Sequence, residues 1–366
     1  MSNKEAKAGV GLIMAGGLGE RLWPESRVTH PKQFLNIDGK ESFLQATYRR
    51  VSDLFGSGNT YLVIREELKE RVISQLPGIS PKNIIAEPMG KDTAACIGLG
   101  SIWIRKEKGD VPIVVFPADH LIRNEERFKQ VILVAVRCAK RGFLVTIGIK
   151  STRPEIGYGY LQTGEKLGDI NGIPFFKVER FIEKPSQKKT EKFFKEGNFL
   201  WNGGIFAWKP STILNQIKKH LPRVYQGVIR ISKALGTKEE RKVIREVYLS
   251  FPKVSIDYGV MEKASLVIAV PGDFFWDDIG NWRALERIFP QDKHGNIIRG
   301  IVQERDTNNC ILINKEDHIL GTIGLSNLII VNTERGLLIM DKERAQEVKD
   351  LVKQLAADEK LRRYVQ

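Results

Sequence analysis

Short apolar runs alternate with longer amphipathic segments through the first 150 residues of the chain. Runs of this length predict buried strands, and the helical spacing of apolar residues between them predicts crossover helices. We therefore expect an α/β fold with a Rossmann-like, mostly parallel sheet that is covered on both faces. The predicted strands cover residues 10–15, 60–65, 83–86, 112–116 and 143–149, and the predicted helices cover residues 42–55, 66–76, 92–106 and 125–140.

The pattern changes beyond residue 150. One strand is predicted over 175–183, and basic segments with helical spacing occupy 186–249. After residue 290, short apolar runs separated by glycine and asparagine predict a small β-rich module, followed by a final helix from about Lys342. These runs cover residues 310–314, 328–332 and 337–340. No internal repeat is evident along the chain.

The composition indicates a globular protein with an excess of positive charge. The 366 residues carry 58 basic and 44 acidic side chains, a formal net charge of +14. Residues 177–245 hold 17 of the basic and six of the acidic side chains, so most of the excess lies in one internal stretch. Taken alone, the charge is compatible with nucleic acid, an anionic membrane surface or small anionic substrates.

Neither membrane insertion nor disulfide formation is expected. No apolar run approaches the roughly 18 residues that a membrane-spanning helix needs, and the first run is too short for a signal peptide. The three cysteines, Cys96, Cys138 and Cys310, are odd in number, far apart and without metal-ligand spacing. These features predict a cytoplasmic protein that is not held at a membrane.

A glycine-rich turn follows the first predicted strand. Gly16, Gly17 and Gly19 can bring backbone N–H groups close to phosphate oxygens, because no Cβ obstructs the approach. The turn lacks both the dinucleotide fingerprint and the Gly-Lys-Ser/Thr of a P-loop. Arg21 and Lys32 follow it and add positive charge. These basic residues favour phosphate binding over a plain turn.

Asp119 follows the fourth predicted strand, at the edge where α/β sheets bind ligands. Mg²⁺ takes one or two protein carboxylates together with substrate phosphates, so this side chain is a candidate metal ligand. An aspartate that caps the next helix is an equal alternative. His120 beside it is more typical of a structural residue.

Three later motifs combine charged, amide and aromatic groups. In FIEKP, Lys184 ends a strand and either reaches an anion or lies exposed on a sheet edge. In WNGGIF, Asn202 suits sugar hydroxyls and the aromatic rings suit the apolar faces of a sugar, although a buried strand with a bulge also explains the motif. In WDDIGNW, Asp277 and Asp278 require a metal, a basic partner or exposure to water.

Taken together, these motifs resemble those of the sugar nucleotidylyltransferase superfamily and, within it, of the mannose-1-phosphate guanylyltransferase (GDP-mannose pyrophosphorylase) family. The resemblance covers nearly the whole chain, because the motifs GGLGERLWPESRVTHPK, EPMGKDTAA, PADH, GYGY, FIEKP, WNGGIF, SIDYGVMEK and WDDIGNW occur in the family's order. It implies transfer of GMP from GTP to mannose 1-phosphate with Mg²⁺ as cofactor. It also implies a nucleotidyltransferase type A-like catalytic domain over 1–290, with a nucleotide part over about 1–150 and a sugar-phosphate part over about 151–290. A left-handed β-helix-like module with a final helix would occupy 291–366.

The resemblance further implies roles for individual residues, all numbered as in this chain. Catalysis would rest on Arg21, Lys32, Asp119, Lys184 and Asp278. Of these, Asp119 and Asp278 would hold Mg²⁺ from opposite walls of a cleft. The nucleotide would contact Ala15, Gly16, Gly17, Gly19, Glu87, Thr93 and Ala94. The sugar would contact Gly159, Glu183, Lys184 and Asn202. Asp257 and Glu262 fall in a family motif but receive no role.

Two alternatives stay open at this point. One is the same chemistry with another hexose 1-phosphate and nucleoside triphosphate, and the other is a non-catalytic homologue that binds sugar nucleotides and regulates a partner. Lys91, Ile156 and Gly203 depart from residues that are common in the family, which leaves the base and sugar contacts open. Nucleic-acid binding has no recognisable motif behind it. Family analogy predicts a homodimer.

Overall fold

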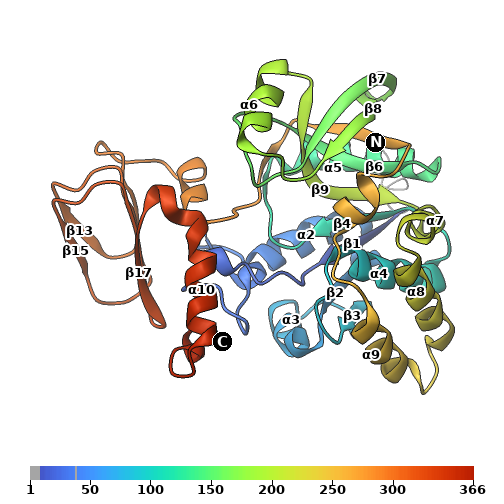
Figure 1. Cartoon of the computed structure of the whole chain (residues 1–366), viewed down its shortest axis with the longest axis horizontal. Helices are drawn as coiled ribbons and strands as arrows, with labels where there is room; N and C mark the ends of the chain where they lie inside the picture. The colour runs from blue at the N-terminus through green and yellow to red at the C-terminus, as the bar shows by residue number, and fades with distance from the viewer. Residues whose placement is uncertain (1–8, 38) are drawn as a thin grey trace. The chain divides into compact units, whose positions relative to one another are not determined.

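The computed structural model describes residues 9–37 and 39–366, which form two compact units (Figure 1). The first unit comprises the chain up to Gly16 together with Gln45–Ala118 and Ile122–Trp276. The second comprises Gly17–Leu44, Asp119–Leu121 and Asp277–Gln366. Neither unit is therefore a single continuous stretch of the sequence.

The first unit is built on a nine-stranded sheet with the order β3-β2-β1-β4-β9-β6-β10-β8-β7. In this sheet β8 and β9 run opposite to the other strands. The predicted mostly parallel α/β sheet is thus confirmed. The strands are β1 (Val10–Met14), β2 (Thr60–Arg65), β3 (Ile84–Glu87), β4 (Ile113–Pro117), β6 (Leu144–Lys150), β7 (Tyr160–Ile170), β8 (Ile173–Ile182), β9 (Phe199–Trp208) and β10 (Val267–Gly272). A separate two-stranded sheet pairs β5 (Leu121–Arg123) with β11 (Phe275–Asp277).

Helices cover both faces of the large sheet. On β1, a Cβ on Gly11 would collide with Val51 of α2, whereas a Cβ on Gly100 of α4 would lie 2.5 Å from Leu12. Because neighbouring residues of a strand face opposite sides, α2 and α4 cover opposite faces. Helices α7 and α8 pack on α4, and α9 packs on α8, as Figure 1 shows. The helices are α2 (Phe43–Phe55), α3 (Lys69–Gln75), α4 (Thr93–Lys108), α5 (Glu125–Lys140), α6 (Gln187–Glu196), α7 (Pro210–His220), α8 (Pro222–Ala234) and α9 (Glu240–Ser250).

The hydrophobic pattern located the early elements better than the later ones. The observed bounds of β2 and α5 are those predicted. By contrast, residues 199–208, which lie inside the predicted basic helical segments, form β9. This strand is buried between β4 and β6, but Asn202, Gly203 and Gly204 interrupt its apolar run, so the run is not continuous as it is in β4. Its register against β6 shifts between Thr146 and Gly148, which confirms the bulged-strand interpretation of WNGGIF.

The second unit contains a coil of short strands. β12, β14 and β16 pair in parallel, β17 pairs antiparallel with β16, and β13 pairs with β15 in a second sheet. Ile311 pairs with Ile329, and Val302 pairs with Leu320, an offset of 18 residues in both sheets. The predicted β-helix-like module is confirmed, and the expectation of no internal repeat is wrong here. The strands are β12 (Ile297–Arg299), β13 (Val302–Arg305), β14 (Ile311–Asn314), β15 (Leu320–Ile323), β16 (Leu328–Thr333) and β17 (Gly336–Asp341).

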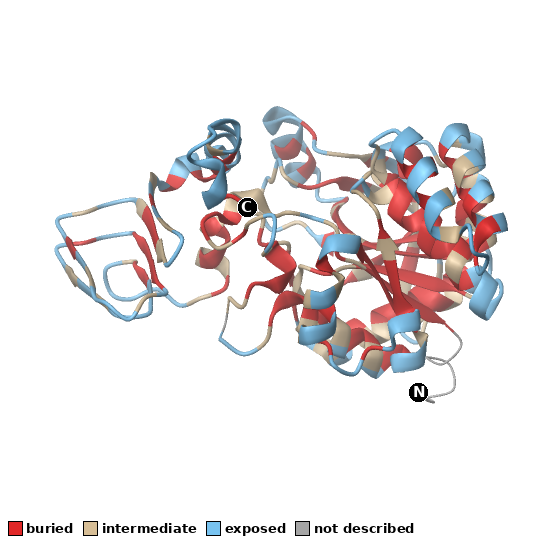
Figure 2. Cartoon of the chain, turned by 90° about the horizontal axis from the view of Figure 1, so that it is seen from below, coloured by how far each residue is buried: buried red, intermediate tan, exposed pale blue. Residues whose placement is uncertain are grey.

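The predicted final helix is present as α10 (Val348–Ala357), which follows the 3₁₀ helix η8 (Lys342–Glu347). Val348 and Val352 join the hydrophobic core of the second unit. Figure 2 shows buried residues concentrated in the strands and on the inner sides of the helices. In the described parts of the chain, no helix combines the length and apolar character needed to cross a membrane. The remaining short helices are η1 (Glu20–Leu22), η2 (Lys32–Phe34), η3 (Ser57–Asn59), η4 (Glu66–Leu68), η5 (Pro81–Asn83), the π-helix η6 (Asp257–Met261), η7 (Trp282–Arg287) and η9 (Arg362–Tyr364).

Candidate active site

The carboxyl ends of β1 and β3 bring three of the predicted nucleotide residues together in the first unit. Ala15 and Gly16 continue from β1, and Glu87 is the last residue of β3. A Cβ built on Gly16 would lie 3.7 Å from Oε2 of Glu87, so this carboxyl group borders the start of the glycine-rich turn. Ligands of α/β sheets bind at this edge.

Glu87 combines burial with a shifted pKa. Glu87 is 3% exposed, and its Oε1 accepts a 2.9 Å hydrogen bond from the hydroxyl group of Tyr248 on α9. Burial raises the pKa of Glu87 to about 7, although the Tyr248 hydrogen bond and the charge of Arg65 act to lower it. A carboxyl group of this kind at a ligand-binding edge is a functional candidate. Tyr248 was not predictable from the sequence, because no motif connects it with Glu87.

The start of α4 carries the other predicted nucleotide residues of this unit, Thr93 and Ala94. Asp92 caps the helix by accepting a hydrogen bond from the Thr93 N–H. The Ala94 N–H donates to the Val254 carbonyl over 3.2 Å, and Oγ1 of Thr93 accepts from the Ile256 N–H over 2.8 Å. These bonds tie α4 to the chain after α9 and occupy both backbone donors.

Asn202 is held by three hydrogen bonds where β9 bulges. Its Nδ2 donates to Oδ1 of Asp257 over 2.9 Å. Its Oδ1 accepts from the hydroxyl group of Thr146 over 3.0 Å and from the Gly204 N–H over 3.2 Å. The Asn202 residue is 9% exposed, so these partners rather than water set the orientation of its amide.

Gly159 lies against Asn202 and Glu183. Its carbonyl oxygen accepts a 2.8 Å hydrogen bond from the Asn202 N–H. A Cβ at position 159 would collide with Oε2 of Glu183 and would lie 3.1 Å from Cβ of Asn202. The structure therefore brings the predicted sugar residues Gly159, Glu183 and Asn202 into one group.

Glu183 and Lys184 complete this group with two ionisable side chains. Oε2 of Glu183 is buried and has no hydrogen-bond partner among the described residues. Burial and, to a smaller extent, the nearby charge of Asp257 raise the pKa of Glu183 to about 7, although Lys184 acts to lower it. Nζ of Lys184 lies 3.6 Å from Oε1 of Glu183, and the lysine side chain is 58% exposed, which leaves it accessible to an anion.

The aromatic residues near Asn202 pack on one another. The ring centroid of Tyr158 lies 5.1 Å from that of Trp201 and 5.1 Å from that of Trp276. Each of the three residues is 7% exposed or less. Trp201 thus offers no open face to a sugar, and the expectation that its ring stacks on one is wrong. The rings support the strand that carries Asn202.

The second unit contains the rest of the glycine-rich turn. Gly19 has a φ of 67°, and a Cβ there would collide with Lys32, so both conformation and space require glycine. A Cβ on Gly17 would meet nothing within 4 Å. Nη1 of Arg21 donates to Oε1 of Gln346 over 2.7 Å, and Nη2 would lie 3.7 Å from a Cβ on Gly280.

Lys32 joins the two candidate metal ligands. Its Nζ lies 2.9 Å from Oδ2 of Asp119 and also donates to the carbonyl oxygen of Asp278. Burial opposes ionisation of Asp119, but the charge and hydrogen bond of Lys32, the charge of His120 and a backbone hydrogen bond together outweigh burial and lower the pKa of this carboxyl group. Asp119 is therefore ionised at neutral pH. The helix-capping alternative is wrong, because Asn124 caps α5.

The adjacent residues Asp277 and Asp278 have different surroundings. Asp277 is 3% exposed, and its carboxylate pairs with Arg287 at 2.5 and 2.9 Å. A basic partner thus accounts for the burial of Asp277. Asp278 is partly exposed, and its Oδ1 accepts a 3.1 Å hydrogen bond from the Gly280 N–H. Together with Asp119 it offers the carboxylate oxygens that Mg²⁺ prefers.

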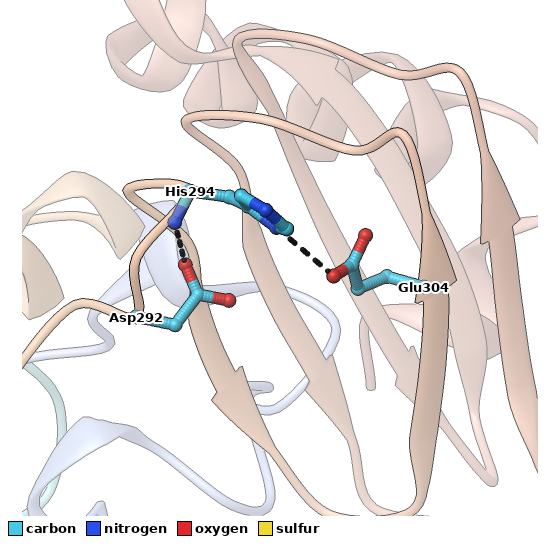
Figure 3. Close-up of side chains that lie close together, drawn as sticks. All are labelled: Asp292, His294 and Glu304. Atoms are coloured by element: carbon cyan, nitrogen blue, oxygen red, sulfur yellow. Dashed lines mark hydrogen bonds and ion pairs between the residues drawn. The ribbon is translucent and has the colours of Figure 1, made fainter.

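Another set of possible metal ligands lies in the first turn of the coil. Ligand atoms of Asp292, His294 and Glu304 lie within 4.8 Å of one another. Figure 3 shows the three side chains close together. Oδ1 of Asp292 accepts from the N–H groups of His294 and Asn296, and Oε2 of Glu304 accepts from the Thr307 N–H. These bonds explain the cluster as a set of turn caps, so we assign no metal to it.

Comparison with known proteins agrees with this arrangement. A family model described as nucleotidyl transferase matches residues 10–295. The chain belongs to the nucleotidyl transferase family. A second model, described as a MannoseP isomerase/GMP-like beta-helix domain, matches residues 303–355, which include most of the coil. Nucleotidyl transferases generally use a divalent metal ion, and the carboxylates of Asp119 and Asp278 are groups that suit one.

Individual relatives narrow the comparison. The chain is 36% identical over 352 residues to a mannose-1-phosphate guanylyltransferase of Klebsiella pneumoniae, which covers 95% of this chain and 74% of that protein. It is 35% identical over 352 residues to the protein of the same name from Escherichia coli, with the same coverage. A solved structure from Thermus thermophilus, described as a mannose-1-phosphate geranyltransferase, is 37% identical with a TM-score of 0.85 and covers 96% of this chain and 100% of that chain. The predicted resemblance is confirmed.

Proposed function

We propose that this protein transfers GMP from GTP to mannose 1-phosphate, giving GDP-mannose and pyrophosphate. One observation carries the proposal: a buried lysine, Lys32, joins Asp119 and Asp278 in a chain that matches mannose-1-phosphate guanylyltransferases over 95% of its length. A reaction between two anions needs this combination of a fixed positive charge and metal-binding carboxylates.

The proposed reaction is an in-line displacement. A phosphate oxygen of mannose 1-phosphate attacks the α-phosphorus of GTP and forms a new P–O bond. The bond from the α-phosphorus to the oxygen that bridges to the β-phosphorus breaks, and its electron pair leaves with pyrophosphate. A phosphate monoester has its second pKa near 6, so the attacking oxygen is already ionised and no general base is needed.

The charged residues would act on the phosphates. Asp119 and Asp278 would hold Mg²⁺, which supplies charge neutralisation and a template for the phosphates when bound. Lys32 would neutralise charge near the α-phosphate, and Arg21 would bind the departing β- and γ-phosphates. Lys184 would hold the phosphate of the sugar. The sugar hydroxyl groups would contact Gly159, Glu183 and Asn202.

The nucleotide would lie along Ala15, Gly16, Gly17 and Gly19, with Glu87 reading the base. Guanine presents two adjacent groups of N–H donors, on N1 and on the exocyclic N2, and a carboxylate is their natural acceptor. Oε1 of Glu87 already accepts from Tyr248, whereas Oε2 borders Gly16. Adenine, cytosine and uracil do not present this pair of donors, so the contact would favour GTP.

The affinity for GTP is expected to rise with pH through about 7, because the pKa of Glu87 is about 7 and only its ionised form accepts both donors. Glu87→Gln is expected to weaken GTP binding by about 10-fold at pH 8 and to remove this contribution to the pH profile. The measurement is calorimetric titration with GTP between pH 6 and 8.5. The γ-phosphate also titrates in this range, so the difference between the two proteins is the readout.

Tyr248→Phe is the control for this prediction. It removes a hydrogen bond that lowers the pKa of Glu87, so it should move the midpoint of the profile to higher pH. Identical profiles in the native protein and in Glu87→Gln would contradict the role given to Glu87.

Three further assignments accompany the proposal. Residues 1–290 would form the catalytic domain, with its nucleotide part over about 1–150, and residues 291–366 would form a separate module. The protein would work in the cytoplasm, where its three buried cysteines stay reduced. It would act as a homodimer, which sedimentation of the purified protein tests directly.

A panel of substrates tests the reaction against its alternatives. Pyrophosphate release is measured with each of GTP, ATP, UTP and dTTP, combined with mannose 1-phosphate or glucose 1-phosphate in the presence of Mg²⁺. The proposal predicts that GTP with mannose 1-phosphate gives the highest kcat/KM. A higher value for another pair would reassign the substrates, and binding without any turnover would indicate a regulatory homologue.

A further inference from the structure

One stretch of the first unit contacts the predicted nucleotide residue Glu87 and the predicted sugar residues Glu183 and Asn202. It runs from Tyr248 near the end of α9 through the π-helix η6 to Glu262, and we call it the 248–262 segment. The motif SIDYGVMEK forms its second half, and the proposed reaction gives this motif no task. A π-helical turn is rare, and such turns occur frequently at functional sites.

At the sugar side, Asp257 controls the amide of Asn202. An asparagine side chain offers two donors and two acceptor positions. Asn202 uses both acceptor positions on Thr146 and Gly204, and one donor on Asp257. One N–H of the amide therefore has no partner among the described residues. It is the group that remains for a hydroxyl oxygen of a sugar.

Glu262 holds the backbone beside Lys184. Its Oε1 accepts a 2.7 Å hydrogen bond from the N–H group of Glu183. The next residue, Lys184, has a φ of 45°, a left-handed conformation that is unfavourable for a residue other than glycine. A charge-assisted hydrogen bond is stronger than a neutral one, so Glu262 offsets part of this cost. Without it, the backbone is free to relax and to carry the lysine away.

The same segment is fixed at its other end. Nζ of Lys91 donates to the carbonyl oxygens of Leu249 and Phe251, over 3.3 and 3.0 Å. The start of α4 adds its bonds to Val254 and Ile256. These contacts make the segment a rigid support, and through them Lys91 caps the C-terminal end of α9.

We propose that Asp257 and Glu262 are positioning residues for the sugar phosphate: Asp257 orients the amide of Asn202, and Glu262 fixes the backbone that presents Lys184. This inference rests on the proposed function, since it takes mannose 1-phosphate as the ligand of this group. Neither residue needs to touch the reacting atoms. Each is expected to act chiefly through one neighbour, so most of its effect should disappear when that neighbour is removed.

A double-mutant cycle tests this dependence. Asp257→Ala is expected to raise both the Kd and the KM for mannose 1-phosphate by about 10-fold and to leave the KM for GTP within about twofold. Added to Asn202→Ala, it should change these constants by less than about twofold, because the amide that it orients is already absent. Asp257→Ser replaces the alanine variant in this test if that variant does not fold, because the serine side chain is too short for its oxygen to reach Asn202.

Glu262 has its own cycle and a conservative variant. Glu262→Ala alone is expected to weaken the binding of mannose 1-phosphate by about 10-fold. In a Lys184→Ala background the same substitution should weaken it by less than about twofold. Glu262→Gln keeps an acceptor oxygen, so its Kd for mannose 1-phosphate should stay within about threefold of the native value. Lys263→Ala is the matched control, because Lys263 is the exposed neighbour of Glu262 and should leave the constants unchanged.

The outcomes separate this inference from the proposed reaction. The Kd for mannose 1-phosphate is measured by calorimetry and needs no turnover. If the losses in Kd are non-additive as expected, they support the positioning roles even where no GDP-mannose forms. If the protein turns over and the losses of mannose 1-phosphate affinity in the single variants simply add in the double variants, the positioning roles are overturned. The proposed reaction is then unaffected. Equal losses of GTP and mannose 1-phosphate affinity also overturn them. A native protein that neither binds nor uses mannose 1-phosphate overturns both.

Discussion

Asp278→Ala and Asp119→Ala should each lower kcat by about 1,000-fold while the protein stays folded. The carboxylate of Asp119 and the backbone carbonyl oxygen of Asp278 both contact the buried Nζ of Lys32, and Lys32 helps to keep the pKa of Asp119 low, so the Asp119 carboxylate is ready to hold a divalent cation at neutral pH. Loss of either ligand would leave the approach of two anions poorly neutralised. Pyrophosphate release measures the loss, and circular dichroism with thermal unfolding checks the fold.

The cluster in Figure 3 provides the matched control. Asp292→Ala also removes a carboxylate from the second unit, but this carboxylate caps a turn and receives no metal in our assignment. Its kcat should stay within about twofold of the native value. Near-normal turnover in folded Asp119→Ala or Asp278→Ala would reject the metal assignment, as would an equal loss in Asp292→Ala.

Lys32→Met should impair both catalysis and stability. The side chain of Lys32 is 7% exposed, and it pairs with a carboxylate that is 31% exposed. Its loss leaves Asp119 without its cation, at a cost of about 2 kcal/mol in the free energy of unfolding, and should lower kcat by about 100-fold. Urea denaturation and pyrophosphate release measure the two effects.

The stability effect has a defined pH dependence. The pKa of Asp119 is lowered in the folded protein, so its ionic contribution is present above the normal aspartate pKa of about 3.9 and is lost as the pH falls through the lowered value. The gap in stability between the native protein and Lys32→Met should therefore be largest at neutral pH and shrink below about pH 4. A gap that grows in acid would contradict the Lys32–Asp119 pair.

The succession of apolar runs and amphipathic segments was enough to predict most of the early fold, because β1 to β4 and α4 to α5 are regular crossover elements. It failed for β9, because Asn202, Gly203 and Gly204 interrupt the apolar run of this buried strand. It also missed the 18-residue repeat of the coil. The repeat is carried by paired positions such as Asn314 and Asn332, whose side chains hydrogen-bond, while the exposed residues between them vary.

The candidate site was predictable as a set of residues but not as a set of contacts. The family motifs supplied Lys32, Asp119 and Asp278, but the different environments of Asp277 and Asp278 depend on Arg287, ten residues further along the chain. In the same way, the partner of Glu87 is Tyr248, 161 residues away. Contacts over such separations are set by packing in three dimensions, and no local spacing encodes them.

The product formed by the purified protein tests the proposed transfer of GMP most directly. The protein is incubated with GTP, mannose 1-phosphate and Mg²⁺, and the nucleotide sugar and pyrophosphate are quantified together by anion-exchange chromatography. The account predicts GDP-mannose and pyrophosphate in equal amounts over many turnovers, with no product in the absence of either substrate. GTP consumed to GDP and phosphate, or no GDP-mannose after prolonged incubation, would contradict it.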